Sequence, residues 1–107
     1  EVDDDPRAVY FKQAKYGVVN ADDPSAVHFI QALKSPNYTT YGIKSGLIQA
    51  KNIKLSAAGT DYSYCDVKNS KDTFHIRTKI PGEFNVYNSL AAACVGKKLG
   101  LNTNKNN

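Results

Sequence analysis

The alternation of apolar and polar positions divides the chain into three regions, and the first covers residues 16–43. It opens with a short apolar run around Val18 and Val19, which is typical of a strand buried on both faces. A second strand is predicted over 37–43, so the order β–α–β predicts parallel strands joined by a right-handed crossover. Between the strands, apolar residues recur on one predicted helical face, at Ala26, Phe29, Ile30 and Leu33.

The second region, residues 47–80, alternates with the period of β-strands. Turn-forming residues at 59–61 and 69–72 divide it into three strands of an antiparallel meander. The apolar positions shift by one near Lys51 and Asn52, which predicts a β-bulge. In the last strand we expect one face to be buried, with Phe74, Ile76 and Ile80, and the other to face solvent, with His75, Arg77 and Lys79.

The third region, residues 83–99, reads as a helix that is apolar almost all round. Together the regions predict an α/β fold: a partial parallel sheet with two flanking helices, plus a three-stranded antiparallel β subdomain. Its length of 107 residues fits one domain or part of one. The acidic start and the polar end suggest a segment cut from a longer chain, and residues 102–107 are predicted to be a disordered tail.

Two asparagines, Asn85 and Asn88, lie three residues apart in the first turn of the predicted helix. On a helical wheel they share a stripe of polar and small residues with Ala92 and Gly96. Such a stripe suits a flat heterocycle, because a carboxamide can pair with the amino group and ring nitrogen of adenine. The alternative is that Asn85 is the N-cap and Asn88 only occupies the first turn. Spacing alone favours this alternative.

Three polar residues, Asn20, Asp22 and Asp23, follow the first predicted strand. Ligands of open α/β sheets bind beyond the carboxyl ends of the strands, so these residues are candidate binding groups. The alternative, which the sequence by itself favours, is turn and capping chemistry, with Asp22 or Asp23 capping a helix that has Pro24 at its first position.

The remaining chemistry-bearing residues form no complete active site. His28 is expected to face solvent on the first helix, and neither it nor His75 has a nucleophile beside it in sequence. Cys65 and Cys94 lack metal-ligand spacing and are read as buried thiols of a reducing compartment. The sequence also lacks a P-loop and a G-x-G-x-x-G motif. We therefore predict no catalytic residues and no metal site.

Charge and hydropathy limit the classes of partner. The net charge is +4, but the lysines are scattered, which does not indicate nucleic acid. An outward basic strip of Lys54, His75, Arg77 and Lys79 leaves open a module that binds an anionic partner. No apolar run is long enough to span a bilayer and no signal peptide opens the chain, so we expect a soluble, cytoplasmic, monomeric protein without a membrane partner.

Four segments resemble the central, ATP-binding domain of the Mur ligases, in the order found in that family. The last is the most specific, because related ligases carry His-Asn where this chain has Phe84 and Asn85, and the Phe form points to the branch that adds the third amino acid to UDP-N-acetylmuramoyl-L-alanyl-D-glutamate. The matching segments are "VVNADDP" (18–24), "TTYGI" (39–43), "AKNIKLSAAGTDY" (50–62) and "IPGEFNVYNSLAAACVGKKLG" (80–100).

The resemblance implies a peptidoglycan-synthesis ligase in which ATP and Mg²⁺ convert the carboxylate of UDP-N-acetylmuramoyl-dipeptide to an acyl phosphate, which the incoming amino acid attacks. It implies that Asn85 and Asn88 lie at the adenine, with Phe84 or Tyr87 near the base. The phosphate loop, the magnesium ligands and the modified lysine of the family have no counterpart in this sequence.

Residues 1–107 therefore resemble the second half of the central domain. Such a fragment is expected to be inactive alone and to carry no bound cofactor. One alternative is another ligase of the superfamily, such as a folylpolyglutamate synthase. The other is the binding module for an anionic partner. The sequence does not decide between diaminopimelate and lysine as the third amino acid.

Overall fold

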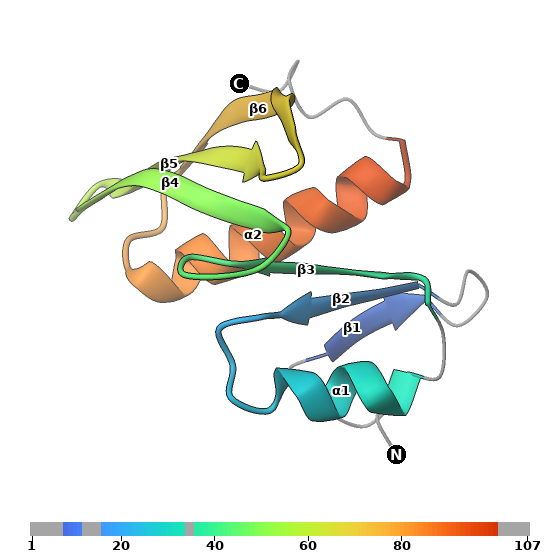
Figure 1. Cartoon of the computed structure of the whole chain (residues 1–107). Helices are drawn as coiled ribbons and strands as arrows, with labels where there is room; N and C mark the ends of the chain where they lie inside the picture. The colour runs from blue at the N-terminus through green and yellow to red at the C-terminus, as the bar shows by residue number, and fades with distance from the viewer. Residues whose placement is uncertain (1–7, 12–15, 34–35, 101–107) are drawn as a thin grey trace.

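The computed structural model describes residues 8–11, 16–33 and 36–100. In this part of the chain six strands form one sheet in which spatial order follows chain order, and the two helices cover opposite faces (Figure 1). The elements are β1 (Ala8–Phe11), β2 (Tyr16–Asn20), α1 (Ala26–Leu33), β3 (Tyr38–Gly42), β4 (Ile48–Ser56), β5 (Gly59–Asp66), β6 (Asn69–Thr78) and α2 (Glu83–Lys98). The tail predicted over 102–107 lies outside the described residues.

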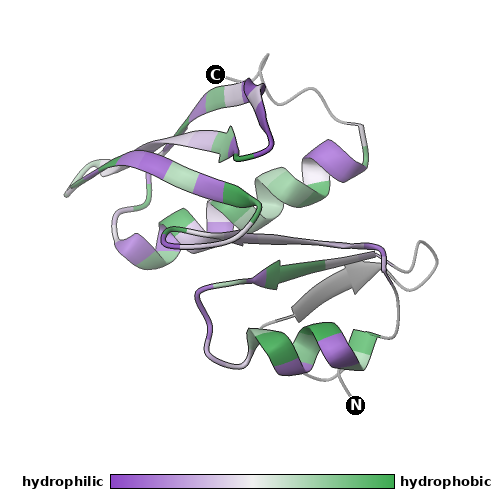
Figure 2. Cartoon of the chain, in the orientation of Figure 1, coloured by the Kyte–Doolittle hydropathy of each residue, from purple (hydrophilic) through white to green (hydrophobic). Residues whose placement is uncertain are grey.

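The β–α–β unit has the predicted parallel pairing, since β2 and β3 run side by side from Gly17 opposite Tyr38. Val18 and Val19 are each 1% exposed, so β2 is buried on both faces as expected. Val18 belongs to the core beneath α2, and Val19, which points to the other face, lies on the side that α1 covers. Figure 2 shows this apolar middle of β2 and the polar residue at its carboxyl end.

Helix α1 begins at Ala26, so the prediction that Pro24 takes the first helical position is wrong. A separate turn precedes the helix: the carboxylate of Asp23 accepts a hydrogen bond from the Ser25 amide at 2.8 Å, and its carbonyl accepts one from Ala26 at 2.9 Å. Asp23 therefore closes this turn and does not cap the first turn of the helix, which differs from the expectation.

The meander is antiparallel as predicted, and the register shifts between Lys51 and Lys54, where Asn52 has φ 55°. It is continuous with the rest of the sheet, because β4 also pairs in parallel with β3. Strand β1 was not predicted from the sequence; it pairs antiparallel with β2 at the opposite edge.

Both turns of the meander lie two residues before the predicted positions, because Gly59 and Asn69 begin strands rather than turns. At Gly59 the reason is close backbone packing, since a Cβ would collide with the carbonyl of Thr78. Ile80 is 64% exposed and not inward as expected, because β6 ends at Thr78.

The core lies between α2 and the sheet. Val86 and Leu90 of α2 are fully buried against Tyr62 of β5 and Tyr41 of β3. Helix α2 packs across four strands, β2 to β5, and thereby joins the parallel and antiparallel parts of the sheet. Among the described residues no helix has both the length and the apolar character to cross a membrane.

The two cysteines differ in burial, which corrects the expectation of two buried thiols. Cys94 lies in the core and burial raises the pKa of its thiol to about 12, whereas Cys65 is half-buried on β5; both are free thiols.

The difference in burial predicts a difference in reactivity, because the thiolate is the reactive form of a cysteine. Iodoacetamide should therefore modify Cys65 in the folded protein and Cys94 only after unfolding in urea, as measured by intact-mass spectrometry. Equal labelling of both in the folded state would contradict the packing described here.

Candidate functional site

A cleft of about 1040 Å³ opens at the carboxyl ends of the parallel strands β2 and β3. One wall is the segment that joins β2 to α1, and the other is one face of α2 from Glu83 to Val95. This is the position at which open α/β sheets bind ligands. The lining residues are Asn20, Asp22, Asp23, Pro24, Tyr41, Glu83, Phe84, Tyr87, Asn88, Ala91, Ala92 and Val95.

The carboxylate of Asp22 holds the loop after β3 in place. It accepts backbone hydrogen bonds from Ile43 at 2.7 Å, from Lys44 at 3.1 Å and from Ser45 at 3.0 Å. The Ser45 hydroxyl donates another, at 2.9 Å. Successive N–H groups that point at one anion form a nest, and here the chain's own carboxylate fills it.

Gly42 is required for this close approach. A Cβ at this position would lie 2.7 Å from Oδ1 of Asp22 and would collide with the carbonyl of Ser45. A residue without a side chain therefore lets the loop fold over the carboxylate.

Tyr87 of α2 joins the helix to the same carboxylate, because its hydroxyl donates to Oδ2 of Asp22 at 2.8 Å. Burial alone would raise the pKa of Asp22, but the hydrogen bonds it accepts, foremost from Ile43 and Lys44, outweigh burial and lower this pKa. Burial and the neighbouring Asp22 carboxylate raise the pKa of Tyr87 to about 12. The proton therefore stays on the tyrosine, and a charged hydrogen bond connects the two walls of the cleft.

The wall formed by α2 combines apolar surface with one amide. Phe84 is 84% exposed, and Asn88, which is also exposed, lies one helical turn from Phe84 and from the small Ala91 and Ala92. An exposed aromatic ring and small side chains make a surface to which a flat ring can stack. This arrangement is compatible with a flat aromatic base.

The two predicted site residues are separated by the structure. Asn88 lines the cleft, but Asn85 does not: its amide nitrogen donates to Thr78 Oγ1 at 2.6 Å and to the Ile80 carbonyl at 3.0 Å. Asn85 is not the N-cap either, since that position belongs to Gly82. The predicted stripe is also broken at Gly96, which is buried. The prediction that both asparagines contact adenine stays untested.

The segment at the end of β2 is placed as expected, since Asn20, Asp22 and Asp23 all line the cleft. His28 is exposed on α1, away from the cleft. Among residues 8–11, 16–33 and 36–100, no three His, Cys, Asp or Glu side chains form a group that could hold a metal ion.

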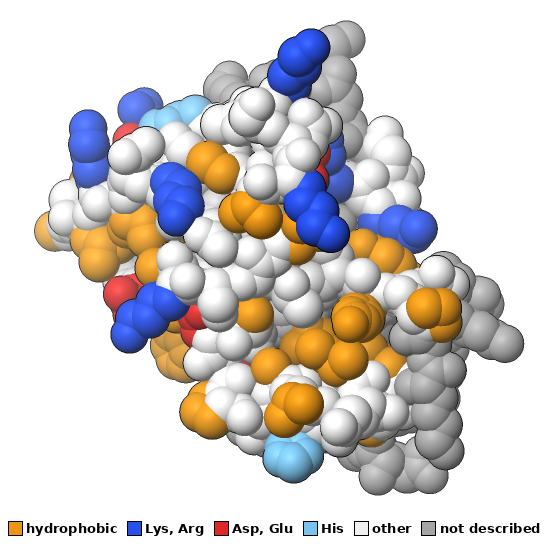
Figure 3. Space-filling model, viewed as in Figure 1, with side chains coloured by type: hydrophobic (Ala, Val, Ile, Leu, Met, Phe, Trp, Pro, Cys, Tyr) orange, Lys and Arg blue, Asp and Glu red, His pale blue; other side chains and the backbone are white. Residues whose placement is uncertain are grey.

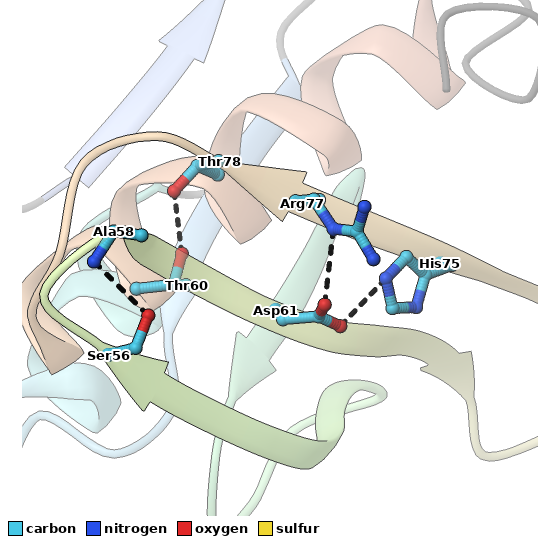
Figure 4. Close-up of polar contacts among 7 residues, drawn as sticks. All are labelled: Ser56, Ala58, Thr60, Asp61, His75, Arg77 and Thr78. Carbon is cyan, nitrogen blue, oxygen red and sulfur yellow. Dashed lines mark hydrogen bonds and ion pairs between the residues drawn. The ribbon is translucent and has the colours of Figure 1, made fainter.

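The outward face of the meander is less basic than its sequence suggests. Figure 4 shows His75 and Arg77 of β6 both facing Asp61 of β5; the distances are 2.7 Å from His75 Nε2 and 3.2 Å from Arg77 Nε. Asp61 thus interrupts the predicted basic strip. Figure 3 shows the Lys and Arg side chains as separate groups over the upper part of the visible face, not as one continuous patch.

Sequence reasoning missed Glu83 and Tyr41 as lining residues and the contact between Asp22 and Tyr87. That contact joins positions 65 residues apart, and no local pattern encodes it. The signal that was present is the run "GEFNVYN" (82–88), whose residues at positions 83, 84, 87 and 88 all reach the cleft.

Comparison with known proteins identifies one family. Residues 9–96 match the Mur ligase middle domain. The chain is 37% identical over 91 residues to the UDP-N-acetylmuramoyl-L-alanyl-D-glutamate–2,6-diaminopimelate ligase of Bacillus velezensis, covering 84% of this chain and 18% of that protein. It is 40% identical over 93 residues to the ligase of the same name from Caldanaerobacter subterraneus, covering 85% of this chain and 18% of that protein.

A solved structure of a UDP-N-acetylmuramoyl-L-alanyl-D-glutamate–2,6-diaminopimelate ligase superposes with a TM-score of 0.70 at 24% identity. The superposition covers 81% of this chain and 18% of that structure, and at this identity it supports the fold alone. The chain thus spans less than a fifth of the length of each of these three proteins.

Proposed function

Because this chain belongs to the Mur ligase family through its middle domain, we propose that the cleft beside α2 takes the adenine base of ATP. In this proposal Asn88 pairs with the base edge, and Phe84 covers its face. The observation that carries the proposal is the place of Asn88, whose exposed amide lies among Phe84, Ala91 and Ala92 at the carboxyl ends of parallel strands.

The chemistry of the cleft supports a base rather than a phosphate group. A carboxamide offers one donor and one acceptor side by side, which complements the amino group and ring nitrogen of adenine. Glu83, Asp22 and Asp23 are the charged residues of the lining, and all are acidic, so the phosphates of ATP would point away from this wall. Groups that neutralise the phosphates, including Mg²⁺, would have to come from elsewhere in a ligase.

For the whole protein we propose an ATP- and Mg²⁺-dependent cytoplasmic ligase that adds the third amino acid to UDP-N-acetylmuramoyl-dipeptide. The names of the two bacterial relatives favour diaminopimelate as that amino acid. The chain of 107 residues supplies part of the base site and is proposed to be catalytically inactive and monomeric alone.

The first test is an ATP titration monitored by amide shifts in ¹H–¹⁵N spectra. We expect shifts centred on Asn88 and Phe84, and a dissociation constant of about 1 mM, because a base contact worth about 4 kcal/mol gives that affinity. Asn88→Leu should weaken binding about tenfold, the effect expected for losing a hydrogen-bonded pair. Gln31→Leu, which replaces an exposed amide on α1, is the matched control and should leave binding unchanged.

A different distribution of shifts would contradict the proposal. Shifts centred on His75, Arg77 and Lys79 that fade steeply with added salt would favour the module for an anionic partner. Equal affinity of the wild type and Asn88→Leu would remove Asn88 from the site.

A further inference from the structure

The position of Asn85, three residues before Asn88 but outside the cleft, gives it a separate role. Resting on the proposed function, we propose that Asn85 is a positioning residue that fixes the first turn of α2 on the meander and so places Asn88 and Phe84 at the base. In this role Asn85 does not contact the base itself.

The donor capacity of Asn85 is already used. An amide NH₂ group has two hydrogens, and the two acceptors within reach are Thr78 Oγ1 at 2.6 Å and the Ile80 carbonyl at 3.0 Å. Both acceptors belong to the end of β6 and the segment after it. A base that needed a donor from Asn85 would have to break one of these bonds.

The acceptor of this bond, the hydroxyl of Thr78, is itself in contact with a buried hydroxyl. The hydroxyls of Thr78 and Thr60 lie 2.6 Å apart, and Thr60, a residue of β5, is 1% exposed. Figure 4 shows this pair of threonines bridging the neighbouring strands β5 and β6. A helix bonded to a buried, paired hydroxyl is held more firmly than one bonded to a mobile surface group.

A second set of bonds holds the backbone of the same turn. Ser89 donates its hydroxyl to the carbonyl of Asn85 at 2.7 Å, and the hydroxyls of Ser89 and Tyr62 lie 2.6 Å apart. Tyr62 is fully buried in β5. The turn around Asn85 is thus connected to both β5 and β6, next to the face of α2 that lines the cleft.

These connections help to hold the start of α2, together with the buried Val86 and the hydrogen bond from Tyr87 to Asp22. Gly82 occupies the N-cap with φ 102°, and no side chain of the described residues caps the helix there. In the part of the chain that the structure describes, the exposed side chains of Phe84 and Asn88 make no hydrogen bond or ring contact of their own. A displacement of about 1 Å is enough to impair a binding geometry. The hydrogen bonds of Asn85 therefore affect the affinity of Asn88 and Phe84 for the base.

The test is a double-mutant cycle on the hydrogen bond, with Asn85→Ala, Thr78→Val and both together. ATP and ITP dissociation constants are measured on the folded proteins. ITP replaces the amino group of adenine with a carbonyl, so it reports how well Asn88 is placed. We expect each single variant to weaken ATP binding about fivefold and to lower the preference for ATP over ITP. The loss in the double variant should be smaller than the sum of the two single losses, because both substitutions remove the same hydrogen bond.

Thr78→Ser is the matched control, because it keeps the hydroxyl that accepts the bond from Asn85, and it should bind ATP like the wild type. Additive losses in the double variant, or a loss in Asn85→Ala without one in Thr78→Val, would overturn the proposal and favour direct contact with the base. A loss of stability alone would weaken ATP and ITP binding equally, which would also overturn it.

Failure of the positioning role of Asn85 can be distinguished from failure of the proposed adenine site. If wild-type protein gives no ATP-dependent shift at Asn88, the adenine proposal fails. The positioning role is then decided without ligand, because Thr78→Val should move the backbone amide signals of Phe84 and Asn88. Unchanged signals at both residues would overturn it. If Asn85→Ala does not fold, Thr78→Val breaks the same bond from its other end.

Discussion

Replacing Asp22 with asparagine should lower the free energy of unfolding by about 2 kcal/mol near neutral pH, a value at the lower end for hydrogen bonds to a charge because the carboxylate is only partly buried. In the wild type this carboxylate accepts hydrogen bonds from three backbone amides and two hydroxyls. An asparagine keeps one oxygen but turns an NH₂ group toward the remaining donors. Urea unfolding monitored by circular dichroism measures the change.

The effect of Asp22→Asn should depend on pH in a defined direction. The hydrogen bonds lower the pKa of Asp22 in the folded state, so its contribution is fully present above the ordinary pKa of an aspartate, near 4. This stability is lost as the pH falls through the depressed folded-state value. Asparagine does not titrate, so the difference in stability between wild type and variant should shrink in acid. A difference that is constant with pH would contradict the role assigned to the carboxylate.

Asp61→Asn is the matched control for this substitution. Asp61 pairs with the exposed His75 and Arg77 on the meander face. Exposed ion pairs contribute at most about 1 kcal/mol, so this variant should be clearly less destabilised than Asp22→Asn.

Replacing Ala92 with leucine should abolish measurable ATP binding while leaving the protein as stable as the wild type. Ala92 is exposed on α2 and lines the cleft, so three added carbon atoms would occupy the space proposed for the base. Leucine is nearly as good a helix former as alanine, with a difference of only a few tenths of a kcal/mol. The amide-shift titration and a urea unfolding curve on the same sample measure both quantities.

Ala32→Leu provides the comparison, because Ala32 is also an exposed alanine within a helix but lies on α1, outside the cleft lining. It should retain wild-type affinity for ATP. If Ala92→Leu also retained it, the base would have to bind elsewhere and the cleft would lose its proposed role.

The fold class could be predicted because its signals are local. The apolar pair Val18–Val19, the helical spacing before Leu33 and the alternation in the meander each report burial through a period of a few residues. The positions of the turns could not be predicted this way. Gly59 signals a turn by type, but here its missing side chain serves a backbone contact with Thr78 on another strand.

The candidate site could be predicted only in part, for the same physical reason. Helical spacing placed Asn85 and Asn88 on one stripe, but which side of α2 faces the sheet depends on Val86 and Leu90 and their partners across the core. Those contacts place Asn88 in the cleft and leave Asn85 bonded to Thr78. The link from Tyr87 to Asp22 depends on the complete sheet, and a single sequence does not contain it.

The chain-order pairing of the strands has a consequence for how the protein is made. Each strand from β2 onward can join its predecessor as soon as it leaves the ribosome, so the sheet can grow without waiting for distant sequence. The helix that covers this part of the sheet is made later, because α2 follows the six strands in the described residues and carries Val86 and Leu90. Before α2 packs on the sheet, Val18, Tyr41 and Ile48 are exposed as an apolar, aggregation-prone surface. A pause in translation before residue 83 would therefore leave a chain that needs a chaperone.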